Sequence, residues 1–253
     1  MRRSIALNVS LTMPIHIQND TLAAARLSAL GDRIAAAAHG RAVELLAVSK
    51  TQSAEAIAAL AACGQRAFGE NYVQEAATKI EALRPLALSW HLVGHLQSNK
   101  AAQAASLFDC IESVDRAKLL PLLDAARGAS GRDPLDVLLQ VNIDDEVSKS
   151  GCAPGDLPAL AEAAAACPNL RLRGLMSIPA PVADLEVRRR SFAALRDLFE
   201  QMRQRHPQVD TLSMGMSEDF ELAIVEGATR VRVGSALFGP RAASHREPAM
   251  ENR

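Results

Sequence analysis

The sequence alternates between short apolar runs and longer helical stretches, and this alternation continues almost to its end. Eight runs are short enough to be buried strands, and they are predicted at 43–50, 66–70, 89–94, 109–114, 136–142, 171–178, 211–217 and 230–235. Helical stretches are predicted between them at about 53–63, 73–83, 97–105, 116–128, 156–166, 184–205 and 217–226. Such a repeat is typical of parallel strands joined by crossover helices.

The number of strands and the chain length together constrain the architecture. Eight strands in 253 residues predict an α/β fold that is a single eight-stranded parallel barrel of the TIM type. The alternative is an open doubly wound sheet, which usually has a glycine-rich turn after its first strand. Here the first strand ends in Ser49-Lys50-Thr51, and no GxGxxG pattern occurs anywhere. We therefore expect the closed barrel.

An extra helix precedes the first strand. The stretch "NDTLAAARLSALGDRIAAAAHG" is strongly helical, with Asn19 or Asp20 as the predicted N-cap and Gly40 just past the end. The start "MRRSIALNVSLTM" lacks a clear signal-peptide cleavage site, and either Met1 or Met13 could be the first residue. The domains expected are a disordered extension (1–18), one ligand-binding barrel (19–241) and a C-terminal tail (242–253).

Composition argues against several classes of partner. The chain has 28 basic and 29 acidic residues and only 3% aromatics, so we expect no nucleic-acid partner. No apolar run approaches the roughly 20 residues of a membrane span, so we expect no membrane partner. The cysteines show no CxxC or metal-ligand spacing, which predicts reduced thiols and a cytoplasmic protein without a metal.

A lysine at the end of the first predicted strand is a candidate reactive residue. The run "ELLAVSK" is built to be buried, yet it ends on Lys50. Strand-end lysines are usually solvated surface residues. In a parallel barrel, however, the active site lies at the carboxyl ends of the strands. The other predicted strand ends there carry polar or small residues, including Asn71, Arg232, Gly234 and Ser235.

The last predicted strand ends in a phosphate-site pattern. In "VRVGSALFG", Gly234 and Ser235 open a short helical turn whose N–H groups and hydroxyl can bind an anion. A plain tight turn is the alternative interpretation. An amine at Lys50 across the mouth from a phosphate site suggests pyridoxal 5'-phosphate (PLP), since an amine forms a Schiff base with its aldehyde.

Seven segments together resemble one known family. They are "LLAVSKTQ", "FGENYVQE", "WHLVGHLQSNK", "DDEVSKSG", "RGLMSIPAP", "LSMGMSEDFELAI" and "RVRVGSALFGPR". In order and spacing they resemble the pyridoxal phosphate homeostasis protein family, which is similar to the N-terminal barrel of alanine racemase. The resemblance runs from about residue 20 to 241. It implies a barrel that binds PLP and serves vitamin B6 and amino-acid homeostasis.

The resemblance also implies roles for individual residues. Lys50 would form the Schiff base, Asn71 would lie beside the cofactor ring, and Arg232 would face the pyridine nitrogen. The phosphate would be held by Ser217, Gly234 and Ser235. Ser217 also stands where a helix N-cap belongs, and the acidic residues after it would repel a phosphate, so capping stays an alternative.

Two further positions bear on how the cofactor is handled. Lys149, in "SKSG", matches a lysine that the family associates with cofactor handling outside the main site. Gln52 departs from the family pattern, because many relatives carry a second lysine there. A role for a neighbouring lysine in cofactor exchange is therefore in doubt for this chain.

The sequence leaves two functions open, a non-catalytic PLP carrier and a PLP-dependent enzyme such as an amino-acid racemase. A racemase needs a base on each face of the substrate's alpha carbon. Alanine racemases take the second base from another subunit and carry a further β domain, whereas this barrel is expected to be complete near Gly239. His91 and His95 are expected to be structural, and Tyr72 is expected to serve or cover the pocket. We therefore expect a carrier, monomeric or weakly dimeric, that serves PLP-dependent apo-enzymes.

Overall fold

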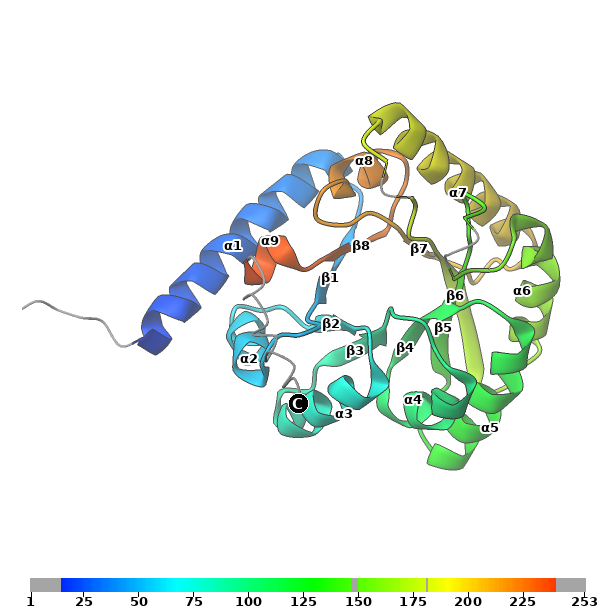
Figure 1. The fold of residues 1–253 in the computed structure, drawn as a ribbon, viewed down its shortest axis with the longest axis horizontal. Coiled ribbons are helices and arrows are strands. Elements are labelled where there is room, and N and C mark those ends of the chain that lie inside the picture. Colours follow the sequence, from blue (N-terminus) through cyan, green and yellow to red (C-terminus); the bar gives the residue numbers. More distant parts are fainter. Residues whose placement is uncertain (1–14, 147–149, 181, 240–253) are drawn as a thin grey trace, which may run out of the picture.

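The described part of the chain forms a closed parallel barrel (Figure 1). A computed structural model describes residues 15–146, 150–180 and 182–239. The strands follow one another around the barrel in chain order, as β1 (Glu44–Val48), β2 (Ala67–Glu70), β3 (Ser89–Leu92), β4 (Cys110–Val114), β5 (Leu135–Gln140), β6 (Leu170–Met176), β7 (Thr211–Ser213) and β8 (Arg230–Val233). The predicted α/β barrel is confirmed.

Pairing between the first and last strands closes the barrel and excludes the open sheet. β1 pairs with β8 in parallel, with Leu45 beside Val231 and Ala47 beside Val233. β1 also pairs with β2 on its other side. Because both edges of β1 are paired, the barrel has no free edge there, which removes the usual site of edge-to-edge association.

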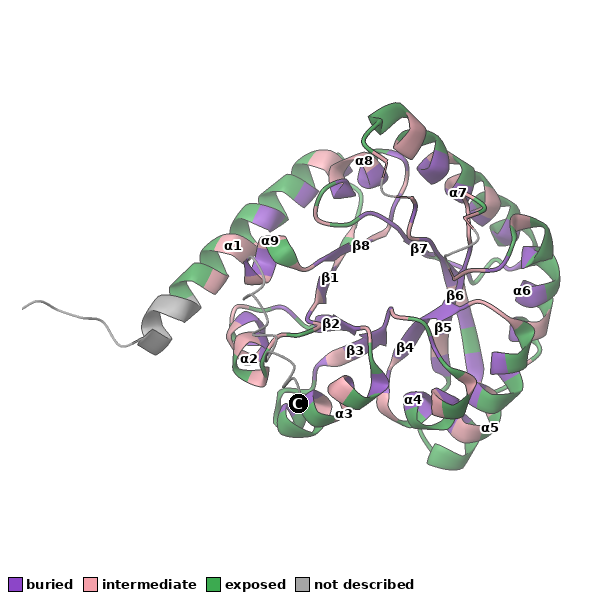
Figure 2. Ribbon diagram, in the orientation of Figure 1, coloured by how far each residue is buried: buried purple, intermediate pink, exposed green. Residues whose placement is uncertain are grey.

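Helices surround the barrel and cover its outer surface (Figure 1). They are α2 (Ala54–Ala62), α3 (Val73–Ala82), α4 (Ala101–Leu107), α5 (Leu120–Ser130), α6 (Leu157–Ala165), α7 (Leu185–Arg205), α8 (Phe220–Val225) and α9 (Ser235–Phe238). Their buried faces turn toward the strands and their exposed faces toward solvent (Figure 2). Ser53 caps α2, accepting a hydrogen bond from the Ala56 N–H at 3.3 Å. No described helix has the length and hydropathy needed to cross a membrane.

An additional helix, α1 (Ile15–Ala38), packs beside α8 and α9 (Figure 1). It begins at Ile15, so the predicted N-caps Asn19 and Asp20 lie inside the helix and that prediction is wrong. An N-cap preference is worth only about 1 kcal/mol, so it does not by itself begin a helix at Asn19 or Asp20. Arg33 of α1 pairs with Glu221 and lies 4.6 Å from the Phe220 ring centre.

The core divides into an outer layer and a barrel interior. Most buried apolar side chains form one cluster between strands and helices. Because side chains alternate along a strand, the other strand positions point inward. The interior contains two small apolar clusters, one of Leu46, Ala67 and Val93, the other of Cys110, Leu138 and Met176. Most of residues 1–18, and all of 242–253, lie outside the described residues, so the predicted terminal boundaries are not tested.

Candidate functional site

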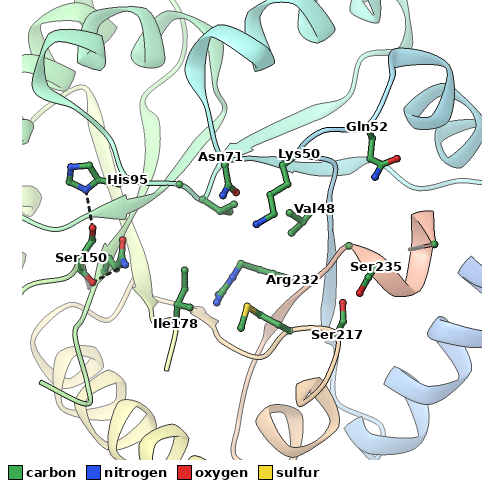
Figure 3. Close-up of a pocket in the computed structure, with 16 residues that line it drawn as sticks. Val48, Lys50, Gln52, Asn71, His95, Ser150, Ile178, Ser217, Arg232 and Ser235 are labelled. Carbon is green, nitrogen blue, oxygen red and sulfur yellow. Dashed lines mark hydrogen bonds between the residues drawn. The ribbon is translucent and has the colours of Figure 1, made fainter. Parts of the chain in front are cut away.

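A cavity of about 440 Å³ opens at the carboxyl ends of the strands (Figure 3). Its volume lies in the range of about 300–1,000 Å³ that is typical of small-molecule sites. The cavity is lined by Val48, Lys50, Gln52, Asn71, Val93, Gly94, His95, Gln140, Ser150, Ile178, Met216, Ser217, Arg232, Gly234, Ser235 and Gly239. Every described residue that the sequence assigned to the PLP site is among them.

Lys50 enters the cavity from the end of β1. The strand ends at Val48, and a turn then carries Lys50 over the mouth, where its side chain extends toward Arg232 (Figure 3). The lysine is half-buried and its neighbour Ser49 is fully buried. The apolar run therefore anchors the backbone, while the half-buried amine of Lys50 reaches the cavity.

The start of α9 lies close to β1 because Gly234 has no side chain. A Cβ atom at Gly234 would stand 3.0 Å from the carbonyl oxygen of Val48, which is tighter than most real contacts. This close approach brings Ser235, the first residue of α9, to the same cavity as Lys50. Figure 3 shows Ser217 and Ser235 on the same side of the cavity.

Ser217 is not a helix cap, so that alternative is wrong. Helix α8 begins only at Phe220, and Asp219 occupies the N-cap position. The Asp219 carboxylate is turned into the protein, where it accepts hydrogen bonds from the Met216 N–H at 2.7 Å and from Arg188 at 2.9 Å. The negative charge of Asp219 is thus compensated by Arg188.

Asn71 reaches the cavity from the end of β2. A Cβ atom at Gly94 would lie 2.2 Å from the backbone oxygen of Asn71, so only glycine allows the loop after β3 to pack there. This contact fixes the Asn71 backbone at the rim, and Figure 3 shows the Asn71 side chain beside Lys50.

Arg232 lies at the base of the cavity and is only 3% exposed. Its Nη1 donates a hydrogen bond to Ser213 Oγ at 2.8 Å, and its Nη2 donates one to the Ser177 carbonyl at 2.7 Å. Burial lowers the pKa of the guanidinium, although nearby carboxylates act against this. Since a guanidinium has five N–H donors, Arg232 can donate a further hydrogen bond into the cavity.

A buried ionic network lies beneath Arg232, and we call His91, Glu112 and Arg230 the inner cluster. Glu112 Oε1 accepts hydrogen bonds from Arg230 at 3.0 Å and faces His91 Nδ1 at 3.0 Å, while its Oε2 accepts one from Ser213 Oγ at 2.6 Å. Burial alone would raise the pKa of Glu112, but the Arg230 charge and the contact with His91 outweigh it and hold the pKa at about 2. Ser213 thus links Glu112 to Arg232.

The inner cluster is a poor metal site although it contains suitable ligand types. His91, Cys110 and Glu112 offer ligand atoms within 4.8 Å of one another. The Arg230 guanidinium already compensates the carboxylate, and burial raises the pKa of the Cys110 thiol well above its usual value. A protonated thiol is a poor metal ligand and the Arg230 guanidinium repels a cation, so Glu112 fits an ion pair with Arg230 better than a metal site.

The other residues that the sequence analysis singled out differ in their position relative to the cavity. His95 lines the cavity, with Nδ1 at 3.1 Å from Ser150 Oγ and 3.4 Å from Asp115 (Figure 3). Tyr72 is 62% exposed and is not among the residues that line the cavity, so its role in serving or covering the pocket stays a prediction. Gln52 lies on the rim. Lys149 lies outside the described residues.

Sequence reasoning missed several lining residues. Gln140, Ser150 and Ile178 come from three different loops or strand ends and form no local pattern. The only signal for them is their position just at or beyond a predicted strand end. Ser213 and Glu112 were missed as supports of Arg232 because they lie inside the barrel and meet it through long-range contacts.

Comparison with known proteins defines the class of barrel. Residues 25–242 match the family described as the N-terminal domain of alanine racemase. Alanine racemase from Corynebacterium glutamicum shares this fold with a TM-score of 0.65 at 18% identity, with 90% of this chain and 63% of the racemase covered.

Closer relatives identify the family within this class. The "Pyridoxal phosphate homeostasis protein" of Pseudomonas aeruginosa is 54% identical over 212 residues, covering 83% of this chain and 90% of the relative. The protein of the same name in Escherichia coli K12 is 48% identical, covering 85% and 95%. The structure of PipY from Synechococcus elongatus with PLP bound is similar with a TM-score of 0.75 at 40% identity, covering 86% and 100%. The chain belongs to the pyridoxal phosphate homeostasis protein family.

Proposed function

We propose that this protein is a non-catalytic PLP-binding protein that buffers or delivers the cofactor in vitamin B6 and amino-acid homeostasis. The observation that carries the proposal is the single cavity that Lys50, Arg232 and the Gly234-Ser235 turn share. Support also comes from PipY, whose structure contains bound PLP at 40% identity to this chain.

The cavity residues fit the parts of the cofactor. Lys50 would hold PLP covalently, its amine condensing with the aldehyde to a Schiff base with release of water. Ser217, Ser235 and the N–H groups that follow Gly234 would bind the phosphate, and Asn71 would pack beside the ring. Arg232 would donate a hydrogen bond to the pyridine nitrogen and keep that nitrogen unprotonated, because a guanidinium does not give up its proton. PLP is a strong electron sink when its ring nitrogen is protonated, so this pairing would weaken the sink without by itself excluding catalysis.

The alternative function is an amino-acid racemase or a related PLP enzyme, and the cavity lining argues against it. Among the described lining residues, the titratable side chains are Lys50, His95 and Arg232. His95 is the one candidate for a second base, and its Nδ1 already contacts Ser150 and Asp115. Arg232 stays protonated and cannot accept a proton. A carrier needs one reactive amine, whereas a racemase needs two correctly placed bases.

The proposal extends to partners and surroundings. We expect PLP-dependent apo-enzymes as recipients, a monomer or weak dimer, and a cytoplasmic location. Lys149 is proposed to assist cofactor handling, and residues 19–241 are proposed as the binding domain. These statements rest on the family resemblance, on the few aromatic residues and on the cysteines, which show no CxxC or metal-ligand spacing.

The test combines spectroscopy with an activity assay. Purified protein with PLP should show a visible Schiff-base band, which Lys50→Ala should abolish and the surface substitution Lys118→Ala should leave unchanged. Apo-forms of PLP enzymes should gain activity when mixed with the loaded protein. Turnover of a common amino acid at about 1 per second or faster would instead indicate an enzyme.

A further inference from the structure

A second buried ionic network lies behind Lys50, on the outer wall of the barrel. We call Glu70, Glu75 and Lys79 the outer cluster. Glu70 ends β2 and is fully buried, while Glu75 and Lys79 lie on α3. Lys79 Nζ donates to Glu70 Oε1 at 2.8 Å and to Glu75 Oε1 at 2.7 Å. None of the three lines the cavity.

The outer cluster binds the backbone on both sides of Lys50. Lys79 Nζ donates its third hydrogen bond to the Ser49 carbonyl at 2.8 Å, and Glu75 Oε1 accepts one from the Thr51 N–H at 2.6 Å. Ser49 is held further, since its hydroxyl donates to Glu70 Oε1 at 2.6 Å. Every N–H of the Lys79 ammonium is therefore used.

These contacts stabilise an unusual turn. The Ser49 carbonyl also accepts a hydrogen bond from the Gln52 N–H at 3.0 Å, which closes a four-residue turn with Lys50 in its second position. Thr51, in the third position, has a φ of 65°, a conformation that a threonine rarely adopts. A turn with this strain persists only where its surroundings hold it, and Glu75 is bonded to the strained residue itself.

We propose that Glu75 and Lys79, supported by Glu70, are positioning residues that aim the Lys50 side chain into the cavity. This inference rests on the proposed role of Lys50 in binding PLP. The cluster acts through the Ser49 and Thr51 peptide groups and fixes the Cα–Cβ direction of Lys50. Covalent attachment requires the amine to reach one point above the cofactor, so a freely moving turn would lower the fraction of protein ready to react.

The inference predicts that variants of the outer cluster change the affinity for one ligand and leave the affinity for a second ligand unchanged. PLP can condense with Lys50, whereas pyridoxine 5'-phosphate has the same ring and phosphate but no aldehyde. Loss of Lys50 positioning should weaken the binding of PLP and leave the affinity for pyridoxine 5'-phosphate unchanged. General damage to the cavity should weaken both.

The experiment measures both dissociation constants for variants of one α3 residue. Glu75 is suited because it is partly exposed, so the protein should still fold without it. Glu75→Ala removes the acceptor for the Thr51 N–H, while Glu75→Gln keeps an oxygen there. The control is Glu81→Ala, which removes an exposed carboxylate of the same helix that pairs only with Arg84 among its described contacts. The circular dichroism of the bound cofactor band reports its orientation in each variant.

We expect Glu75→Ala to raise the dissociation constant for PLP about tenfold, equivalent to about 1.4 kcal/mol, and to alter the dichroic band of the bound cofactor. Glu75→Gln should recover most of the loss, Glu81→Ala should match the parent, and pyridoxine 5'-phosphate should bind all four proteins alike. Unchanged PLP affinity in Glu75→Ala, or an equal loss for both ligands, would overturn the inference. If Lys50→Ala itself leaves the visible band intact, the proposed role of Lys50 fails instead, whatever Glu75 does.

Discussion

The inner and outer clusters are both buried and ionic, yet they support the cavity in different ways. The outer cluster bonds to the main chain, at the Ser49 carbonyl and the Thr51 N–H, and so fixes a turn. The inner cluster bonds to a side chain, since Glu112 reaches Arg232 through Ser213. The outer cluster therefore positions the backbone that carries Lys50, whereas the inner cluster positions the guanidinium group of Arg232.

The two clusters also differ in charge. In the inner cluster Glu112 faces Arg230 and His91, and its pKa is lowered to about 2. In the outer cluster one ammonium serves two carboxylates, and burial raises the pKa of Glu70 despite its bonds to Lys79 and Ser49. The comparison shows that the inner carboxylate stays ionised at any ordinary pH, whereas the outer carboxylate of Glu70 takes up a proton at a higher pH than Glu112 does. The clusters should therefore respond differently to mutation and to acid.

The largest effect is expected from Glu112→Gln. The substitution removes the charge that compensates buried Arg230 and leaves only Glu44 as its described carboxylate partner. Breaking a buried ion pair from one side costs about 3–5 kcal/mol, so urea unfolding should show a loss of this size. Glu218→Gln, at an exposed position, is the control and should change stability by less than about 0.5 kcal/mol. Equal losses would mean that the inner cluster does not stabilise the barrel.

At low pH, the parent protein should lose the higher free energy of unfolding that Glu112 gives it relative to the Glu112→Gln variant. Its folded-state pKa of about 2 lies below the ordinary value of 4.5, so the stabilisation is complete above pH 4.5 and is lost as the pH falls through 2. This difference corresponds to about 3 kcal/mol. Unfolding free energies of parent and Glu112→Gln should thus converge between these pH values. A constant gap would contradict the low pKa.

A smaller loss, about 2 kcal/mol, is expected from Lys79→Met. Glu70 loses its cation but can take up a proton, because burial already raises its pKa above 4.5. A raised folded-state pKa penalises the ionised form at neutral pH, and the penalty fades as the pH falls toward 4.5. The gap to the parent should therefore close at higher pH than for Glu112→Gln. Lys118→Met, on the surface, is the control. A loss for Lys79→Met that grows toward acid would refute this account of Glu70.

The smallest effect is expected from Thr51→Gly. Glycine relieves the positive φ of Thr51 but makes the unfolded chain more flexible, and the two contributions are each about 1 kcal/mol with opposite sign. The free energy of unfolding, measured by thermal denaturation, should therefore change by less than about 1 kcal/mol. Thr51→Val keeps the strain and is the matched comparison. A large destabilisation by glycine would mean that Thr51 contributes a contact that outweighs the backbone strain.

Much of the fold was predictable because it depends on local patterns. Each predicted strand and each helix between strands was found, with ends shifted by a few residues at most, since strand–helix alternation is a property of short windows. Lys50 and Arg232 were predictable because strand ends converge in a barrel. The start of α1 and the alternative that Ser217 caps a helix were predicted wrongly, because helix α1 continues through Asn19 and Asp20 and helix α8 begins only at Phe220.

The supports of the site could not be predicted from the sequence. Lys79 lies 30 residues from Ser49, and Glu112 lies 101 residues from Ser213. In the sequence Lys79 reads as an ordinary solvated residue of a helix, yet its side chain is only 8% exposed. Such pairs depend on the register of strands and on the rotation of helices, which short-range patterns do not specify.

The most direct test of the central claim is reduction of the PLP-loaded protein with borohydride, followed by peptide mapping. Reduction converts the Schiff base to a stable secondary amine and so marks the lysine that holds the cofactor. The account predicts a single modified peptide that carries the label on Lys50, and no label in Lys50→Ala. A label found on another lysine, with Lys50 unmodified, would contradict the claim that the lysine at the tip of β1 holds the cofactor.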